Sequence, residues 1–479
     1  MPADRRRTPR EATTRHATNA MDAAHASDAA HTIVVDLGFG DAGKGAVVDR
    51  LCQDGTVQAV VRFNGGAQAA HNVVTADGRH HTFAQFGSGT LRAVPTHLSR
   101  FMTVDPLALS AEADHLRTVG VPDPYALLTV DRAAPLATPY HAAANRLREQ
   151  ARGAGRHGSC GMGVGEAARY ALAHPGDAPT VGDCLSRTRL LRQLRLLRDR
   201  LADELGPLPA PPVEDCADVF AAFARAVTLT DGAALHALLR RGRVVFEGAQ
   251  GVLLDEWHGF HPYTTWSTTT FANAETLLAE AGAPRPALRL GVLRTYTTRH
   301  GPGPLVTEDP ELTPLLPEPH NGHGRWQGAF RIGHFDAVAH TYAVEVCGGV
   351  DALAVTHLDA PGRARGLRIC RAYGIDGRLV ERLTPGPPGD LDRQAALTAR
   401  LRTARPALWD TPGRDPRRWS EAIGAALGAP VLLESSGPAR QVLRRLPAAA
   451  QAGTTAMAGT TAPGGTPVTA APPTTAAFR

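Results

Sequence analysis

A glycine-rich loop at residues 38–45, with the sequence GFGDAGKG, constrains the fold more than any other feature of this chain. The residues before it, 32–35, form a short apolar run like that of a buried parallel strand, and residues 46–51 have the spacing of a helix. Glycines at such a junction let backbone N–H groups and a helix N-terminus approach a phosphate. The segment therefore predicts an α/β protein with a P-loop-like phosphate loop.

The loop satisfies two phosphate-binding patterns at once, GxGxxG for dinucleotides and GxxxxGK for triphosphates. A dinucleotide site needs an acidic residue about 20 residues further on, and residues 62–64 read Arg-Phe-Asn instead. The triphosphate pattern has its cation at Lys44, although Gly45 replaces the usual Mg²⁺-binding hydroxyl. Asp41 is the natural substitute, because a carboxylate suits a hard cation. Triphosphate binding is favoured, with a dinucleotide site or a ligand-free turn as alternatives.

Composition sets Lys44 apart. One lysine and fifty arginines make up the 51 basic residues. An ammonium is a compact charge on a flexible stem, which suits contact with a transferring phosphate.

Other features exclude whole classes of protein. The net charge is +5 and aromatic residues are 5% of the chain, which does not favour nucleic-acid binding. No apolar run approaches about 18 residues, so we expect no membrane span. Six scattered cysteines without a CxxC pair do not form a disulfide framework. We expect a cytoplasmic protein.

Strand and helix signals alternate through the middle of the chain. Residues 57–63, 244–246, 352–355 and 431–433 read as further strands, and residues 185–205 as a helix. This rhythm predicts a mainly parallel central sheet flanked by helices, with ligands at the carboxyl ends of the strands. We expect one catalytic α/β domain at 30–447, between a disordered N-terminal tail at 1–29 and a disordered Thr/Ala/Pro/Gly-rich tail at 448–479.

Six segments resemble, in the same order, the motifs of the adenylosuccinate synthetase family. They are GFGDAGKG at 38–45, NGGAQAAH at 64–71, FEGAQG followed by LLD at 246–255, TTRHGPGP at 297–304, THLD at 356–359 and SGP at 436–438. The likeness spans about residues 32–446 and implies the fold of that family.

The resemblance also implies a reaction. The family joins L-aspartate to the 6-position of IMP through a 6-phosphoryl intermediate driven by GTP, in AMP biosynthesis, with Mg²⁺ and as a homodimer. By this likeness Asp41 would deprotonate the purine N1, His71 would act as general acid near the β–γ bridge, and Lys44 would contact the transferring phosphate.

The resemblance assigns the other candidate residues by ligand. The nucleotide and its phosphates are assigned to Gly40, Gly43, Lys44, Gly45, His357, Asp359, Ser436 and Gly437. The purine monophosphate is assigned to Gln68, Ser159, Cys160, Gln250 and Arg331. L-Aspartate is assigned to Thr297, Thr298, Arg299 and Gly301, with Arg299 pairing in bidentate fashion. Mg²⁺ is assigned to Asp41 and Ala70.

Departures from the family pattern keep alternatives open. Cys160 and Met162 replace a threonine and an arginine in the substrate-phosphate segment, and His357 replaces a lysine in the guanine-reading motif. A related ligase for a modified or deoxy purine, such as a 2-aminopurine nucleotide, with ATP in place of GTP, is therefore one alternative. A GTP-binding protein that has lost catalysis is another.

Overall fold

The computed structural model describes residues 31–283, 285–318, 321–437 and 443–445. The tails predicted at 1–29 and 448–479 lie outside these described residues.

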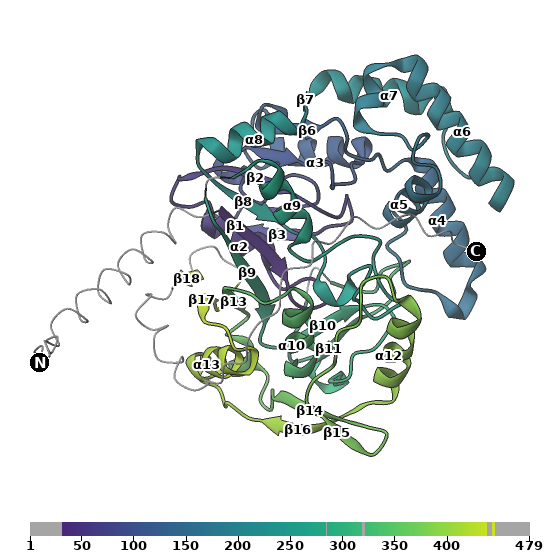
Figure 1. Ribbon diagram of the computed structural model, residues 1–479. Helices are drawn as coiled ribbons and strands as arrows, with labels where there is room; N and C mark the ends of the chain where they lie inside the picture. Colours follow the sequence, from purple (N-terminus) through teal and green to yellow (C-terminus); the bar gives the residue numbers. More distant parts are fainter. Residues whose placement is uncertain (1–30, 284, 319–320, 438–442, 446–479) are drawn as a thin grey trace, which may run out of the picture.

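A ten-stranded sheet runs through the molecule (Figure 1). Its strands, in spatial order, are β18 (Leu443–Arg445), β17 (Val431–Ser435), β13 (Ala352–Thr356), β9 (Ala287–Arg294), β1 (His31–Asp36), β8 (Arg243–Glu247), β2 (Val57–Arg62), β5 (Thr96–Leu98), β6 (Leu128–Asp131) and β7 (Thr228–Thr230). Every neighbouring pair is parallel except β17 with β18. The predicted mainly parallel sheet is confirmed, including the five strands expected from apolar runs.

The apolar runs follow from burial on both faces. All six residues of β1 are buried, because helices cover the sheet above and below. The α-helices within residues 44–280 are α2 (Lys44–Leu51), α3 (Pro106–Thr118), α4 (Pro139–Ala151), α5 (Val164–Ala173), α6 (Arg187–Leu205), α7 (Val213–Ala226), α8 (Gly232–Arg241) and α9 (Ala272–Glu280). The helix predicted at 185–205 is α6, which begins after its N-cap Ser186.

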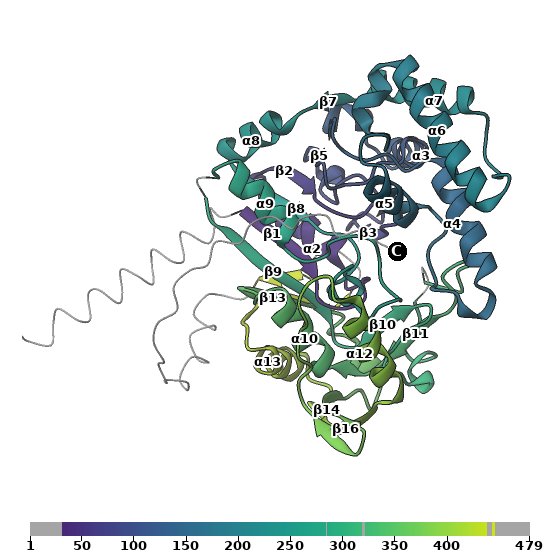
Figure 2. The same cartoon turned by 45° about the vertical axis from the view of Figure 1, so that its right-hand side comes forward.

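A second, smaller sheet was not anticipated. Its central strand β14 (Ile369–Ile375) pairs with β12 (Phe335–Asp336), β15 (Arg378–Val380) and β16 (Arg405–Asp410). In both views it lies with α10 (Ala337–Val346), α12 (Leu391–Thr403) and α13 (Pro416–Leu427) on the side of the molecule away from α6 and α7 (Figure 2). The short helix α11 (Ala360–Arg363) and the pairs β3 (His71–Val74) with β4 (His80–Phe83) and β10 (Thr297–His300) with β11 (Phe330–Gly333) complete the fold.

Three turns of the polypeptide lie at one edge of the sheet because each of them follows a parallel strand. The phosphate loop (residues 38–45) follows β1, residues 248–251 follow β8, and residues 357–359 follow β13. Carboxyl ends of parallel strands share one edge of the sheet, which is where ligands bind in such folds. None of the described helices is both long and apolar enough to cross a bilayer.

Candidate active site

The phosphate loop closes around a carboxylate of the chain itself. Asp36, the last residue of β1, accepts hydrogen bonds from the backbone N–H groups of Gly38 at 2.8 Å, Gly40 at 3.3 Å and Ala42 at 2.9 Å. Its Oδ2 also lies 2.9 Å from Nζ of Lys44, and both side chains are almost fully buried. An internal anion therefore holds the N–H groups that the sequence suggested for a ligand.

The structure adds a partner for Lys44, a buried ion pair with Asp36. Contact of Lys44 with the transferring phosphate stays a prediction. Asp36 was missed, although its position as a charged residue directly between an apolar strand and the loop was a visible signal.

Asp41 protrudes from the loop toward a second ionisable group. Its backbone is left-handed, with φ of 60°, and its Oδ2 lies 3.2 Å from Nε2 of His300 in β10. Burial alone would raise the pKa of Asp41, but His300, Arg294 and Lys44 together lower it below its ordinary value. The same contact raises the pKa of His300 against the effect of burial. The pair therefore favours an ionised carboxylate beside a protonated imidazole.

His71 is held by Glu247 at the end of β8. Nδ1 of His71 donates to Oε1 of Glu247 at 2.6 Å, and the same carboxylate accepts from the backbone N–H and the hydroxyl of Ser88. Burial lowers the pKa of His71 to about 4 against the opposing effect of Glu247. Burial would raise the pKa of Glu247, but His71 and Arg62 lower it. A neutral imidazole with a fixed tautomer follows, since an ionised carboxylate only accepts.

Close packing brings His71 to the phosphate loop. A Cβ on Gly45 would lie 2.9 Å from the carbonyl oxygen of Asn72 and 3.0 Å from the carbonyl carbon of His71. The missing Ser or Thr hydroxyl at Gly45 therefore has a steric reason, because α2 and β3 touch there.

Gln250 has the environment of a ligand contact. Its backbone is left-handed, with φ of 58°, and it lies against Gly40 and Gly65. Both its amide oxygen and its amide nitrogen are buried without a partner among the described residues. Buried polar atoms are nearly always paired, so an unpaired amide beside the phosphate loop indicates a bound group.

The residues assigned to the guanine gather between β13 and β17. The backbone N–H of Leu358 donates to the carbonyl of Ser435 at 2.9 Å, which brings Ser436 and Gly437 close to the 357–359 turn. Oδ2 of Asp359 pairs with Arg363 at 2.9 Å, while Oδ1 is buried without a partner in the described chain. His357 stacks edge-on against Tyr296, and burial lowers its pKa well below the ordinary value. Pro438, the last residue of the motif, lies outside the described residues.

Two of the predicted arginine contacts have protein partners in the structure. Arg299 is buried, and its guanidinium donates to the carbonyls of Pro302, Pro304 and Tyr263. Arg331 donates to the carbonyls of Gly301 and Gly303 and pairs with Glu308. Both side chains hold the loop after β10, and their contacts with L-aspartate and with the purine monophosphate stay predictions.

The remaining candidates fall around the same centre. Thr297 and Thr298 are buried in β10, and Gly301 has a left-handed φ of 69°. Oε1 of Gln68 is buried without a partner in the described part of the chain, next to Gly66. Ser159 donates to Asn145 at 3.0 Å, and burial raises the pKa of the neighbouring Cys160 thiol.

The donor set fits Mg²⁺ if substrate phosphates and water supply most of the ligands. Across the described residues, three or more His, Cys, Asp or Glu side chains nowhere gather as a metal site. Mg²⁺ in nucleotide enzymes is commonly held by one or two carboxylates together with substrate phosphates and water. Asp41 has one oxygen engaged by His300 and one carboxylate oxygen to offer, and Ala70 is exposed.

The phosphate loop, the Asp41–His300 pair, the His71–Glu247 pair and the unpaired Gln250 amide share one edge of a parallel sheet. Together they define a nucleotide-binding α/β enzyme with acid–base groups at its phosphate site. Residues 33–442 match the family model described as adenylosuccinate synthetase. The chain belongs to the adenylosuccinate synthetase family and is a ligase of that family.

Curated relatives agree over nearly their full length. The adenylosuccinate synthetase of Alkalilimnicola ehrlichii is 33% identical over 430 residues, covering 86% of this chain and 97% of the relative. That of Acidithiobacillus ferrooxidans is 34% identical over 446 residues, with the same coverage, 86% and 97%.

Solved structures confirm the fold. Fully ligated adenylosuccinate synthetase from Plasmodium falciparum matches with a TM-score of 0.75 at 20% identity, covering 87% of this chain and 100% of that chain. The succinoaminodeoxyadenylate synthetase of cyanophage S-2L matches with a TM-score of 0.55 at 19% identity, covering 88% and 97%.

Proposed function

We propose that this ligase joins L-aspartate to the 6-position of IMP with GTP as phosphoryl donor. The observation that carries the proposal is the carboxylate of Asp41, which emerges from the phosphate loop and is paired with His300 at 3.2 Å. A carboxylate in that place can take a proton from a purine nitrogen while the loop faces phosphate.

The first step places charge on the purine oxygen. Asp41 accepts the N1 proton of IMP, so electron density moves to O6, and O6 attacks the γ-phosphorus of GTP. The β–γ bridging bond breaks and GDP leaves with the electron pair. Mg²⁺, held by Asp41 and the Ala70 carbonyl, would neutralise charge on the phosphate oxygens. In the second step the aspartate amine adds at C6, the C6–O6 bond breaks, inorganic phosphate leaves with the electron pair, and the amine nitrogen loses one proton to water.

His71 acts where negative charge develops. Glu247 holds Nδ1, and the far nitrogen, Nε2, has no hydrogen-bond partner among the residues that the structure describes, so it can face the nucleotide. Burial in the protein lowers the pKa of this imidazole to about 4. A neighbouring phosphate favours the protonated ring, because an opposite charge within about 4–6 Å raises the pKa of an imidazole. His71 then donates a hydrogen bond to the departing oxygen.

Separate observations support GTP as the phosphoryl donor and IMP as the acceptor nucleotide. Oδ1 of Asp359, buried and unpaired within the described residues, can accept from the guanine N1 and N2 groups, which adenine lacks. The curated relatives are named for adenylosuccinate, which favours IMP over a 2-aminopurine nucleotide with ATP. The pairs Asp41–His300 and His71–Glu247 favour a working ligase over a protein that has lost catalysis. We also propose a cytoplasmic homodimer, as the family resemblance implies.

An assay tests the whole proposal. With IMP, GTP, Mg²⁺ and L-aspartate, the full chain should release phosphate and give the absorbance of adenylosuccinate, and the rate should fall when ATP replaces GTP. A screen of ribo and deoxy purine monophosphates with both donors is the control for acceptor choice. Phosphate release with none of them would exclude the ligase.

His300→Ala should lower kcat by about ten- to a hundredfold, because it removes a hydrogen bond to a charged carboxylate. His300→Gln should recover part of the loss, since an amide N–H can donate to Asp41 in place of Nε2. The exposed His323 gives the matched control, and His323→Ala should leave kcat unchanged. A rise in the KM for GTP with unchanged kcat would contradict a positioning role.

A further inference from the structure

The peptide group that follows Asp41 is held at both of its ends. Its carbonyl oxygen, on Asp41, accepts a hydrogen bond from Nη2 of Arg294, the last residue of β9. Its N–H group, on Ala42, donates to Oδ2 of Asp36 at 2.9 Å. The next carbonyl, on Ala42, accepts from the hydroxyl of Thr356 at 2.8 Å. A cation and an anion therefore fix the plane of the peptide group from which the Asp41 side chain emerges.

The backbone of Asp41 depends on these contacts. Its φ of 60° lies in the left-handed region, which residues other than glycine seldom occupy. A residue in such a conformation persists where the surrounding structure over-determines it. A hydrogen bond from a charged donor is stronger than one between neutral groups, so Arg294 stabilises this conformation more than a neutral side chain would.

Arg294 is itself held in one orientation. Its Nη1 donates to Oε1 of Glu318 at 2.6 Å, and the same oxygen accepts from the hydroxyl of Tyr296 at 2.5 Å. Cζ of Arg294 lies 4.9 Å from the centroid of the Tyr296 ring. Only 6% of the Arg294 side chain is exposed. One planar guanidinium thus reaches both Asp41 and Glu318, which the single ammonium of a lysine cannot do in the same way.

Neighbouring strands place the two donors that hold the loop. Arg294 and Thr356 are paired positions at the carboxyl ends of β9 and β13. A Cβ on Gly43 would lie 3.3 Å from Cγ2 of Thr356, so the phosphate loop packs directly on this pair of strand ends. The donors therefore come from the sheet itself, which suits a site that must hold a reacting group within about 0.5 Å.

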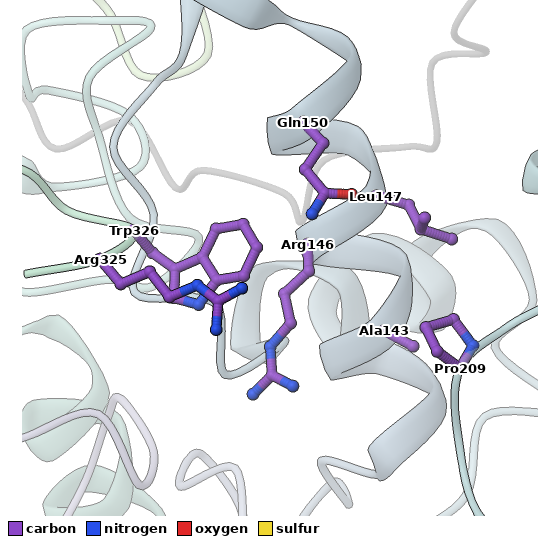
Figure 3. Close-up of a pocket in the computed structure, with 7 residues that line it drawn as sticks. All are labelled: Ala143, Arg146, Leu147, Gln150, Pro209, Arg325 and Trp326. Atoms are coloured by element: carbon purple, nitrogen blue, oxygen red, sulfur yellow. The ribbon is translucent and has the colours of Figure 1, made fainter.

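The guanidinium of Arg294 has no room for a ligand of its own. The space that it lines beside the phosphate loop is about 10 Å³, roughly what one water molecule needs. Arg146 on α4 differs, because its side chain extends into a cavity of about 300 Å³ that Trp326 also lines (Figure 3). Arg294 therefore acts on the reaction through the residues that it holds.

We propose that Arg294 is a positioning residue for the proton transfer at Asp41, an inference that rests on the proposed function. Arg294 fixes the peptide group after Asp41, so that the carboxylate faces the purine nitrogen. Glu318 and Tyr296 keep the guanidinium in place. Arg294 keeps its proton and its charge throughout, and no bond to it forms or breaks.

A double-mutant cycle with Asp41→Asn tests the proposal on the full-length chain. Arg294→Gln should lower kcat by about ten- to a hundredfold, the loss expected for a hydrogen bond from a charged group, with unchanged KM for GTP and for IMP. In the Asp41→Asn background the same substitution should lower kcat by no more than about twofold, because the proton acceptor is already gone. Arg294→Lys should recover part of the loss, since it keeps the charge and one of the two contacts.

Arg289 gives a matched control on the same strand. It lies near the amino end of β9, donates to the carbonyls of Cys347 and Gly348, and pairs with Glu275 at 2.8 Å. Arg289→Gln removes contacts of the same kind and should leave kcat unchanged.

A second variant replaces Arg294→Gln if that protein does not fold. Glu318→Gln keeps an acceptor for Arg294 and removes only the charge of a side chain that is 14% exposed. It should lower kcat by about tenfold, the difference between a charged and a neutral hydrogen bond, and again only where Asp41 is present.

Hydrogen exchange gives a readout that needs no turnover. The N–H group of Ala42 is buried and held by Asp36, so the amides of residues 38–45 should exchange slowly in the wild type. In Arg294→Gln they should exchange about ten- to a hundredfold faster, because the peptide group has lost one of its two anchors. The amides of β14 should exchange as in the wild type.

The outcomes separate this inference from the proposed function. An equal loss of kcat with and without Asp41→Asn, or a higher KM for GTP with unchanged kcat, would overturn the positioning role alone. If no purine monophosphate gives phosphate release, the ligation reaction is wrong. Faster exchange at 38–45 in Arg294→Gln would then still support Arg294 as the anchor of Asp41, and unchanged exchange would overturn it.

Discussion

Replacing Asp41 with asparagine should lower turnover by about 10²–10⁴-fold, the range expected when a proton-transfer group is lost. Asparagine keeps the shape of the side chain and tolerates the left-handed backbone, which has a φ of 60°. The amide cannot take the N1 proton, and it carries no charge to pair with His300. Phosphate release with saturating IMP, GTP and L-aspartate measures the effect.

The fold and the nucleotide affinity are the controls for this variant. Asp41 is only partly buried, and its carboxylate has His300 as its ion-pair partner. The melting temperature and the Kd for GTP without Mg²⁺ should therefore stay near the wild-type values. Turnover within a factor of ten of wild type would remove Asp41 from the proton transfer.

Asp36→Ala should destabilise the protein by about 3–5 kcal/mol, as expected when one partner of a buried ion pair is removed. Lys44 would keep its charge in a site where its side chain is 2% exposed. The N–H groups of Gly38, Gly40 and Ala42 would also lose their acceptor. Urea unfolding of the variant and the wild type measures the difference in free energy.

A double variant separates the charge from the packing. Asp36→Ala with Lys44→Met removes both charges, and it should recover part of the lost stability because no unpaired ammonium remains.

Lys44→Arg keeps the charge but places a larger planar group where the space beside the loop is about 10 Å³, so it should impair both stability and turnover. Unchanged stability in Asp36→Ala, with a lower KM for GTP, would instead identify Asp36 as a displaceable stand-in for phosphate.

Much of the fold was predictable, because apolar runs report burial directly. The strands at 32–35, 57–63 and 244–246 were expected from short apolar runs beside turn residues, and they are found as β1, β2 and β8. The second sheet around β14 was missed, since β15 and β16 are partly exposed and the pairing of β14 with β16 joins segments about 30 residues apart. Pairing between distant segments leaves no local period in the sequence.

The sequence predicted which residues form the site, but it did not predict which partner each side chain contacts. The motifs placed Asp41, His71 and Gln250 near one phosphate site, and the structure brings all three to one edge of the sheet. They did not indicate that Glu247 orients His71 or that His300 faces Asp41. Glu247 lay inside a quoted motif and His300 at the variable position of TTRHGPGP, so both residues were visible and their roles were not.

The main sheet, the phosphate loop and the family of this protein could be read from the amino-acid sequence, because apolar periodicity and ordered motifs are local properties of the chain. The partners of the charged groups could be read only from the folded structure. It paired Lys44 with Asp36 and turned Arg299 and Arg331 to backbone carbonyls. An ionised side chain interacts strongly with whatever lies within a few ångströms of it, and the folded backbone decides which groups lie there, even for residues as close in the chain as Asp36 and Lys44.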